Sequence, residues 1–515
     1  MKLFSNCLRA PQLPQNNSWL NTDKPLSIKE LKGRIIILDF WTYCCINCLH
    51  IIPDLKYLEQ KYKDSLTIIG IHSAKFDNEK EIENVRQAII RYDIEHPILV
   101  DKNFKIWQDY AVRAYPTLIV INPQGYIVAS VIGEGKRDIL EELIQQIIEQ
   151  HSKQNTIKFQ ELNLTLEKQR SPIITPLSFP SKVLATNVGL LITDTGYNRI
   201  IHTSLTGELF NIIGTSKAGL IDGNFTEVEF SAPQGMTFDS ENQILYIADT
   251  NNHSIRQIDL IRQQVKTIAG TGKQSRNIHR HHGKALETAL NSPWDLVKIG
   301  KNLFIAIAGS HQIWKMDLDS NIIGTCAGTG AEACYDSNLM ESVFAQPSGI
   351  TTNGDELFVA DSENSTIRGV GLGESAQVRT ICGSGNLFEF GDKDGVGKDV
   401  LLQHCLGIEY ADGNIWIADT YNHKIKSINP STGECKTVLG NGGFSLQDGI
   451  GINASFSEPS GLSVFGNSLY IADTNNHVIR EVNLNSLEVT TLNFPGLCSP
   501  DFCISAVSVN PTNSL

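Results

Sequence analysis

The stretch DFWTYCCINCLHIIP, residues 39–53, decides the fold of the N-terminal part of this 515-residue chain. Its first residues complete the apolar run RIIILDFW (34–41), which is typical of a strand buried in the middle of a sheet. Residues 48–62 then carry apolar side chains at helical spacing, and a second apolar run, LTIIGIHSA (66–74), follows. The sequence therefore predicts a strand, a helix and a strand, with Cys45 and Cys48 at the start of the helix.

The same alternation continues to residue 150. We expect a helix over residues 79–91, a strand over 96–101, a short helix near 104–110, a hairpin over 116–133 and a helix over 137–150. Strands that alternate with helices indicate an α/β domain, which we assign to residues 1–150.

The spacing of Cys45 and Cys48 gives the strand–helix junction its chemistry. Unpaired backbone N–H groups and the helix dipole stabilise a thiolate at a helix N-terminus, which favours Cys45 as a nucleophile with Cys48 within disulfide reach. The alternative is a buried or metal-binding pair. Because the sequence has no second CxxC and no nearby pair of histidines to complete a zinc site, we predict a redox pair with no metal and no cofactor.

Residues 39–53 resemble the active-site segment of thioredoxins, because Asp39, Trp41, Cys45, Cys48 and Pro53 stand at that family's spacing. The resemblance implies that Cys45 is the attacking thiol and Cys48 the resolving thiol. It also implies that Asp39 is a buried carboxylate that assists proton transfer at Cys48. Substrate binding is implied for Trp41.

A second match to that family lies at Tyr115-Pro116-Thr117, which resembles the cis-proline loop that receives an extended substrate. The inserted segment at about 72–95 is similar to the TlpA-like and peroxiredoxin-like branch of the thioredoxin fold. No peroxidase-type cysteine segment is present, so the resemblance implies reductase or exchange chemistry.

Two features depart from the thioredoxin pattern. Cys44 replaces the aromatic residue that usually precedes the first cysteine, and is either a possible accessory thiol or a packed small residue. Ile46 and Asn47 replace the pair that often sets the redox poise. They can shift the potential in either direction across the range of about 150 mV that thioredoxin-fold proteins occupy.

Residues 151–175 are polar and contain prolines, and we interpret them as a linker. After them one motif recurs six times, and each copy reads as four short strands with an Asp-Thr-x-Asn turn in the middle. Four antiparallel strands per repeat indicate a propeller blade, so we predict a six-bladed β-propeller over residues 176–515. The copies are anchored at Asp194, Asp249, Ile307, Asp361, Asp419 and Asp473.

These units resemble NHL repeats. Aspartate, histidine and arginine recur in them, which invites a metal or catalytic interpretation, but a residue needed in every blade is a folding device. The third copy has Ile307 in place of the turn aspartate, so its turn is either held differently or shorter. We expect the ring to be closed by a strand from the linker or from residues 503–511.

A thioredoxin-like domain followed by a six-bladed NHL propeller resembles the NHL repeat-containing protein 2 family over nearly the whole chain. The segment CCINC (44–48) is itself a feature of that family. The predicted fold is therefore multidomain, with an α/β thioredoxin-like part and an all-β propeller.

Composition narrows the partners and the compartment. The formal net charge is −13, with the acidic excess in the repeat region, which argues against nucleic-acid binding. The N-terminus lacks a run of seven apolar residues and no 18-residue apolar span follows, so we expect no signal peptide and no membrane contact. The 11 cysteines are scattered, as expected for reduced thiols in a cytoplasmic protein.

Three classes of function fit these features. We favour a thiol–disulfide oxidoreductase whose propeller docks a client or partner protein, with a disulfide-containing protein and a cellular thiol reductant as redox partners. The alternative is a non-catalytic protein-interaction scaffold with structural or regulatory cysteines. A propeller hydrolase would need a singular set of polar residues on the inner strands, and the repeat supplies none.

Overall fold

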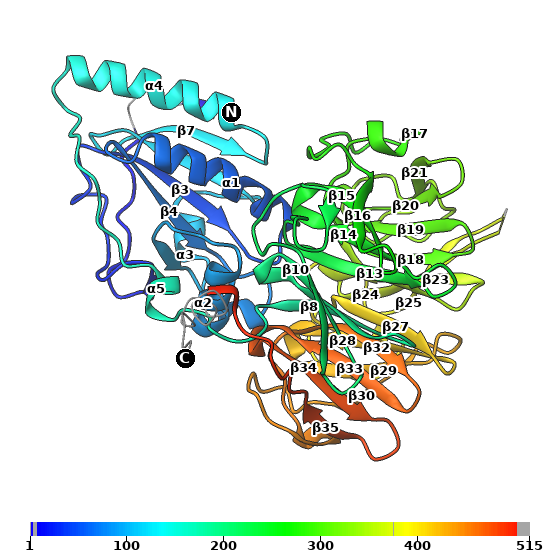
Figure 1. Cartoon of the computed structure of the whole chain (residues 1–515). Coiled ribbons are helices and arrows are strands. Elements are labelled where there is room, and N and C mark those ends of the chain that lie inside the picture. The colour runs from blue at the N-terminus through cyan, green and yellow to red at the C-terminus, as the bar shows by residue number, and fades with distance from the viewer. Residues whose placement is uncertain (1, 4–7, 374, 502–515) are drawn as a thin grey trace, which may run out of the picture. The chain divides into compact units, whose positions relative to one another are not determined.

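Strand β3 (Ile35–Trp41) is buried over all seven of its residues, as the apolar run predicts. It belongs to the first of two units, Met1–Ile173 and Ile174–Leu515, into which the chain divides in the computed structural model (Figure 1). The structure describes residues 2–3, 8–373 and 375–501.

The first unit is a thioredoxin-like α/β domain built on a seven-stranded sheet in the order β1-β7-β6-β3-β4-β5-β2. β3 lies parallel to β4 and antiparallel to β6, and β4 lies parallel to β5. The other strands are β1 (Lys2–Leu3), β2 (Trp19–Leu20), β4 (Leu66–His72), β5 (Ile98–Val100), β6 (Thr117–Ile121) and β7 (Ile127–Ile132).

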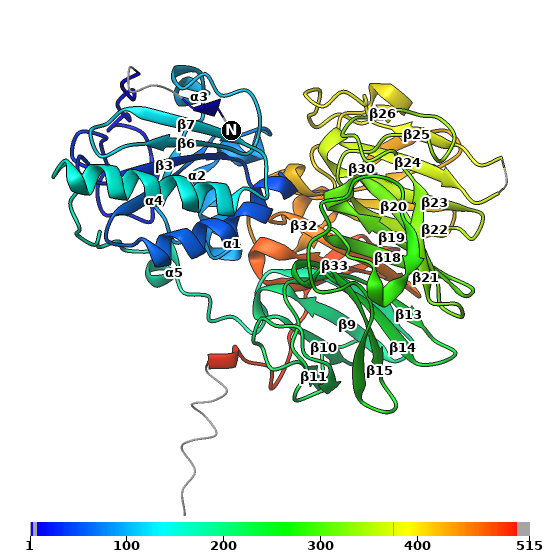
Figure 2. The same cartoon turned by 90° about the horizontal axis from the view of Figure 1, so that it is seen from above.

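Two helices, α1 (Ile46–Lys61) and α4 (Arg137–Lys153), cover one face of this sheet (Figure 2). Their apolar side chains share one core with the sheet, and a second core lies on the opposite face. Burial on both faces explains why β3 and β4 read as continuous apolar runs. The remaining helices are η1 (Asn78–Lys80), α2 (Ile82–Arg91), α3 (Lys105–Asp109) and α5 (Glu167–Arg170).

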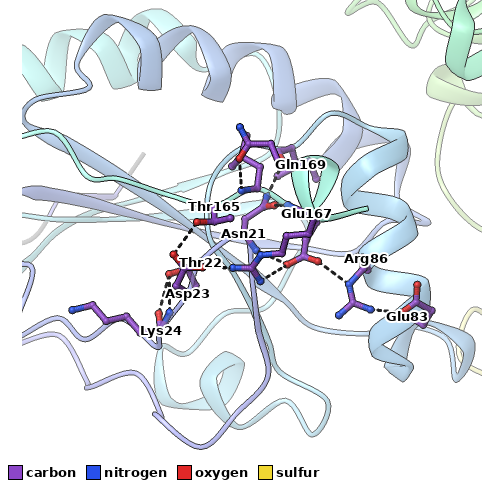
Figure 3. A network of polar contacts seen from close by, with 12 residues as sticks. Asn21, Thr22, Asp23, Lys24, Glu83, Arg86, Thr165, Glu167 and Gln169 are labelled. Carbon is purple, nitrogen blue, oxygen red and sulfur yellow. Dashed lines mark hydrogen bonds and ion pairs between the residues drawn. The ribbon is translucent and has the colours of Figure 1, made fainter. Parts of the chain in front are cut away.

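Residues 151–173, most of the segment interpreted as a linker, belong to the first unit. Glu167 is buried, and its carboxylate accepts hydrogen bonds from Asn21 N at 3.3 Å and Arg86 Nε at 2.8 Å (Figure 3). Asn21 Oδ1 in turn accepts from Glu167 N at 2.7 Å. The bonds between Asn21 and Glu167 join positions 146 residues apart, and together with Arg86 they fasten the end of the segment to the α/β domain.

The second unit is a six-bladed β-propeller, as the repeats predict. The innermost strands, which pack side by side around the ring, are β8 (Pro180–Thr186), β13 (Pro233–Asp239), β18 (Pro293–Ile299), β22 (Pro347–Thr352), β27 (Gly407–Ala411) and β32 (Pro459–Phe465). The second strands are β9 (Gly189–Asp194), β14 (Ile244–Asp249), β19 (Asn302–Ile307), β23 (Glu356–Asp361), β28 (Asn414–Asp419) and β33 (Ser468–Asp473).

Two further strands complete each blade. The third strands are β10 (Arg199–Thr203), β15 (Ser254–Asp259), β20 (Gln312–Asp317), β24 (Thr366–Gly371), β29 (Lys424–Ile428) and β34 (Val478–Asn483). The fourth are β11 (Leu209–Ile213), β16 (Gln264–Ala269), β21 (Ile322–Ala327), β25 (Val378–Cys382), β30 (Glu434–Leu439) and β35 (Glu488–Thr491). Four blades add a short outer strand, β12 (Gly223–Asn224), β17 (His282–Lys284), β26 (Gly395–Val396) or β31 (Gly449–Ile450).

A buried aspartate ends the second strand of five blades and ties neighbouring segments together. In blade six, Asp473 Oδ1 accepts from Ser457 N at 2.7 Å, and Asp473 Oδ2 accepts from Asn476 Nδ2 at 2.9 Å and Arg480 Nη1 at 2.8 Å. A buried charge is tolerated when it is paired and fully hydrogen-bonded, so the repeated aspartate is structural, as predicted. The equivalent pairs are Asp194–Arg199, Asp249–Arg256, Asp361–Arg368 and Asp419–Lys426.

The residue after each turn adopts the left-handed conformation, and its side chain caps the next blade. His477 Nδ1 accepts from Phe179 N at 3.1 Å, which ties blade six to blade one. Accepting at Nδ1 requires a neutral imidazole, so these histidines are structural. The equivalent acceptors in the other blades are Asn198, His253, His311, Ser365 and His423.

Blade three replaces the buried ion pair with an apolar pair. Ile307 occupies the aspartate position and Trp314 the arginine position, and both are buried. The turn keeps its length as a 3₁₀ helix over Ala308–Ser310, so it is held differently rather than shortened. Trp314 Nε1 donates to Gln312 Oε1 at 2.8 Å. The blade therefore forms without any charge at this site.

Each blade is built from consecutive strands of the chain, so within residues 174–373 and 375–501 no strand from the linker completes a terminal blade. The ring closes instead through packing and hydrogen bonds between blades six and one. The other predicted closing segment, residues 503–511, lies outside the described residues.

We predict that Arg480→Met lowers the free energy of unfolding by about 3–5 kcal/mol, because it leaves the carboxylate of Asp473 buried without its cation. The double variant Asp473→Ile/Arg480→Met should recover about half of that loss, since blade three tolerates an apolar pair at the same positions. Denaturant unfolding of the full chain measures both effects. A double variant as unstable as Arg480→Met would contradict the prediction.

A second prediction concerns acid stability. Burial lowers the pKa of His423 from 6.5 to about 4, so the unfolded chain binds this proton more readily and the free energy of unfolding falls as pH drops from about 6.5 to about 4. His423→Asn should keep the cap, as Asn198 does, without titrating. Between pH 7 and 4.5 the parent should lose about 2 kcal/mol more than the variant in urea unfolding. Parallel losses would rule out His423 as the acid-sensitive group.

Candidate active site

Cys45 stands between the end of β3 and the first turn of α1. It is the N-cap residue, with φ −82° and ψ 112°, and its carbonyl accepts from Cys48 N at 3.0 Å and Leu49 N at 3.2 Å. Its side chain forms no capping hydrogen bond and is partly exposed. The structure thus places an accessible sulfur at the N-terminus of α1.

Cys48 is the buried member of the pair, with an exposed fraction of 1%. Burial raises the pKa of its thiol, and a hydrogen bond with the Cys45 side chain and the proximity of Cys45 and Asp39 raise it further. Both cysteines are free thiols in this structure. Cys48 therefore needs a base before it can act as a nucleophile, and Cys45 is the sulfur that a client can reach.

Asp39 lies in β3 with 2% of its surface exposed. Burial raises its pKa to about 7, with an opposing effect from His96 and a smaller contribution from Glu59. Its Oδ1 atom has no hydrogen-bond partner among the described residues. A carboxyl group that titrates near neutral pH can both take and return a proton.

Cys44 is held by Glu79, a residue that no sequence motif singled out. Glu79 is fully buried, and its Oε1 accepts from Cys44 N at 3.0 Å. Its Oε2 accepts from the N–H groups of Lys75 and Phe76, both at 2.9 Å. One carboxylate thus joins the loop before the nucleophile to the inserted segment. Cys44 is itself 2% exposed, which favours its role as a packed small residue.

The loop that carries Pro116 lies beside the end of β3, because Thr117 pairs with Phe40. The Tyr115–Pro116 peptide is cis, as the sequence predicts. Tyr115 is partly exposed and its hydroxyl donates to Ser73 O at 2.6 Å, whereas Pro116 and Thr117 are buried. The side chain of this loop that is open to a substrate is therefore Tyr115.

Trp41 does not occupy the position expected of a substrate-binding residue. It is 1% exposed and packs edge-on against His72, with ring centroids 5.1 Å apart. Burial lowers the pKa of His72 to about 3, so this imidazole is neutral. Because Trp41 ends a fully buried strand, it supports the site from inside and offers no surface to a substrate.

The innermost strands of the propeller hold singular charged residues, which corrects the expectation that the repeat supplies none. Lys182 in blade one and Asp295 in blade three stand where the other four blades have glycine, at Gly235, Gly349, Gly407 and Gly461. Lys182 Nζ lies 3.0 Å from Asp295 Oδ2, and both residues are buried. Asp295 also accepts from the N–H groups of Leu296 and Ile350. Its oxygens are thus used to join blades.

Two other kinds of site are absent from the described ranges. No cluster of three or more histidine, cysteine, aspartate or glutamate side chains in residues 8–373 and 375–501 is arranged to hold a metal ion. No helix in the same part of the chain is long and apolar enough to cross a membrane.

Two family profiles match the chain, thioredoxin-like over residues 33–127 and NHL repeat over residues 344–369. NHL repeat-containing protein 2 of Homo sapiens is 40% identical over 94% of this chain and 71% of its own length. Protein SUPPRESSOR OF QUENCHING 1, chloroplastic, of Arabidopsis thaliana is 40% identical over 95% of this chain, which spans 48% of that protein.

The first unit also has relatives of its own. Thiol-disulfide oxidoreductase ResA of Bacillus cereus is 32% identical over 24% of this chain and 69% of its own length. The thioredoxin-like domain is thus related to thiol–disulfide oxidoreductases.

We predict that Asp39→Asn stabilises the protein at pH 8 by about 3 kcal/mol and has no effect near pH 4. The folded-state pKa of about 7 lies above the ordinary 3.8, so ionisation favours the unfolded chain and the free energy of unfolding falls as pH rises from about 4 through 7. Urea unfolding at both pH values measures the difference. An equal gain at both would show that packing, and not charge, explains the change.

Proposed function

Because this chain belongs to the NHL repeat-containing protein 2 family, we propose that its first unit is a thiol–disulfide oxidoreductase that acts on protein disulfides. Cys45 is the attacking thiol, Cys48 the resolving thiol and Asp39 the base that serves Cys48. The propeller acts as a docking platform for the client protein. Family membership supports the architecture, and the thiol geometry supports the chemistry.

The observation that carries the proposal is the difference between the two cysteines. Cys45 is partly exposed at the N-terminus of α1, whereas Cys48 is buried, has a raised pKa and lies next to a carboxyl group that titrates near pH 7. An accessible nucleophile backed by a protected second thiol suits a two-step exchange. A purely structural pair would not need this asymmetry.

In the first step the Cys45 thiolate attacks one sulfur of a client disulfide. A bond forms between Cys45 Sγ and that sulfur, the client S–S bond breaks, and the other client sulfur leaves as a thiolate that takes a proton from solvent. Cys48 then gives its proton to Asp39 and attacks Cys45 Sγ. The client leaves as its second thiolate, reduced by two electrons, and the Cys45–Cys48 disulfide holds the oxidising equivalents.

A cellular thiol reductant closes the cycle by reducing that disulfide. We include a reducing, cytoplasmic setting in the proposal, because a thiol reductant has to reach the Cys45–Cys48 disulfide. The residues of the cis-proline loop, chiefly Tyr115, contact the client backbone.

The alternative function is a non-catalytic interaction scaffold with regulatory or structural cysteines. The burial of Cys44, Cys48 and Trp41 favours it. Among the predicted site residues, Cys45 and Tyr115 alone are partly exposed to solvent. In that case the propeller alone would bind partners, and Cys45 would react no faster than an ordinary exposed thiol.

We predict that Cys48→Ser accumulates a mixed disulfide on Cys45 and that Cys45→Ser does not, when each reduced variant in a Cys44→Ser background meets a peptide disulfide. Removing the resolving thiol leaves the first adduct without an intramolecular attacker. Intact-mass and peptide mass spectrometry should show at least about tenfold more adduct on Cys45 than on any other cysteine.

The matched control is the Cys44→Ser parent, which should form the adduct only transiently. Equal adduct yields from Cys48→Ser and Cys45→Ser would overturn the assigned order of attack. A Cys48→Ser variant whose Cys45 stays unmodified by the peptide disulfide would reject the oxidoreductase and leave the scaffold.

A further inference from the structure

A glycine beside Asp39 allows a buried histidine to approach the sheet. Asp39 in β3 lies directly opposite Gly70 in β4. A Cβ atom at Gly70 would lie 2.4 Å from Ile98 Cδ1, 2.9 Å from Trp41 Nε1 and 3.3 Å from His96 Nε2. The space over Gly70 is therefore already taken by these groups, and the glycine lets the imidazole of His96 approach the strand position next to Asp39.

Three buried polar atoms around Gly70 have no hydrogen-bond partner among the described residues. They are Asp39 Oδ1, Trp41 Nε1 and His96 Nε2. An unsatisfied buried polar atom destabilises the fold, so three in one place call for an explanation beyond stability. Two of them belong to groups that can carry a proton.

The other ring nitrogen of His96 lies near a partly exposed carboxylate. His96 Nδ1 lies 3.3 Å from Glu59 Oε2, and the Glu59 side chain is 23% exposed. Glu59 and Pro97, the residue after His96, both line a surface cavity of about 110 Å³. His96 therefore stands between a carboxyl group sealed inside the domain and one that water can reach.

The charges around His96 suit a proton carrier. Burial opposes the imidazolium, but Glu59, Asp39 and Glu95 together outweigh burial and raise the pKa of His96. The groups that face Asp39 are His96, Glu59 and the thiol of Cys48. Each of His96 and Asp39 thus affects the protonation of the other.

The backbone that carries His96 is fixed by the network of Figure 3. Asn21 Nδ2 donates to Ile94 O at 2.8 Å and to His96 O at 3.0 Å, and Asn21 is itself bonded to Glu167. Lys168 Nζ lies 2.7 Å from Glu95 Oε1. The segment that follows α4 thus holds the imidazole in place.

We infer that His96 relays protons between Asp39 and the surface carboxylate of Glu59, and so lets Asp39 act repeatedly as the base for Cys48. The inference rests on the proposed oxidoreductase function. His96 acts through Asp39 and does not touch the client.

The relay balances over one cycle. The relay starts from a neutral His96 with its proton on Nδ1. After Cys48 gives its proton to Asp39, the carboxyl group has to approach His96 Nε2 to hydrogen-bond distance and pass the proton on, and His96 releases the proton on Nδ1 to Glu59 and solvent. When a thiol reductant later reduces the Cys45–Cys48 disulfide, Cys48 leaves as a thiolate and takes a proton back along the same path. Glu59 then returns a proton to Nδ1 and His96 Nε2 gives one to Asp39, which restores the starting tautomer.

The first test follows the second step of exchange in the full chain with Cys44→Ser. The probe is the symmetric disulfide of thionitrobenzoate. Attack by Cys45 releases one thionitrobenzoate, and the relevant signal is the second release, which follows attack by Cys48 and is absent in Cys48→Ser. His96→Asn should slow this release about tenfold at pH 7 and move its pH midpoint upward by about one unit, because Asp39 loses the group that lowers its pKa. Glu59→Gln should slow the release less.

His50→Asn is the matched control. It removes another imidazole–carboxylate pair from α1, since His50 Nδ1 lies 2.5 Å from Glu134 Oε2, but His50 is not among the groups that shift the pKa of Asp39. Its pH profile should equal that of the parent. A His96→Asn profile that overlays those of the parent and His50→Asn would overturn the relay.

A second readout needs no redox activity. The stability difference between the parent and Asp39→Asn, measured by urea unfolding, grows as pH rises above the ordinary carboxyl pKa and levels off above the folded-state pKa of Asp39. In the His96→Asn background the pH at which it levels off should rise by about one unit. An unchanged pH of levelling off would overturn the coupling of His96 to Asp39. A parent that shows no second release phase, with a shifted pH of levelling off, would reject the oxidoreductase while keeping that coupling.

Discussion

A carboxylate taken out of water has to be compensated, and this protein meets that constraint in two opposite ways. In the propeller, Asp473 receives a cation and N–H donors at hydrogen-bond distance, so its charge becomes a tie between segments. In the thioredoxin-like unit, Asp39 is also buried but has a bare Oδ1 and no cation in contact among the described residues. The same physical cost therefore produces structure in one unit and a proton-active group in the other.

Blade three shows what the propeller requires of its turns. Ile307 and Trp314 fill the places of the aspartate and the arginine, and the turn keeps its length and its left-handed His311. The two positions of a blade have to be filled either by apolar side chains or by a charged pair whose hydrogen bonds are satisfied. A particular ion pair is not required. The side-chain caps from each blade to the next, ending with His477 on Phe179, are the feature present in all six.

The thiol centre depends on contacts that converge on a short stretch of β3 and α1 from distant segments. Glu79 holds the loop at Cys44, Gly70 leaves room for His96, and Glu167 with Asn21 fixes the backbone that carries His96. Only Cys45 of the pair is left accessible. Enclosure of Cys48 and Asp39 lets burial and the neighbouring groups set the protonation of both.

The sequence by itself determined the strand–helix junction at Cys45 and Cys48, the cis-proline loop and the six blades. Each of these features produces a local periodicity, a short motif or a repeat that can be recognised in the sequence. It assigned Trp41 to substrate binding and treated residues 151–175 as a linker. It did not reveal Glu79, His96 or the pair Lys182–Asp295. Only the tertiary structure decided these, because they depend on which buried polar groups meet across the fold. Partners such as Asn21 and Glu167, 146 residues apart, leave no local pattern, since burial and pairing are properties of three-dimensional proximity.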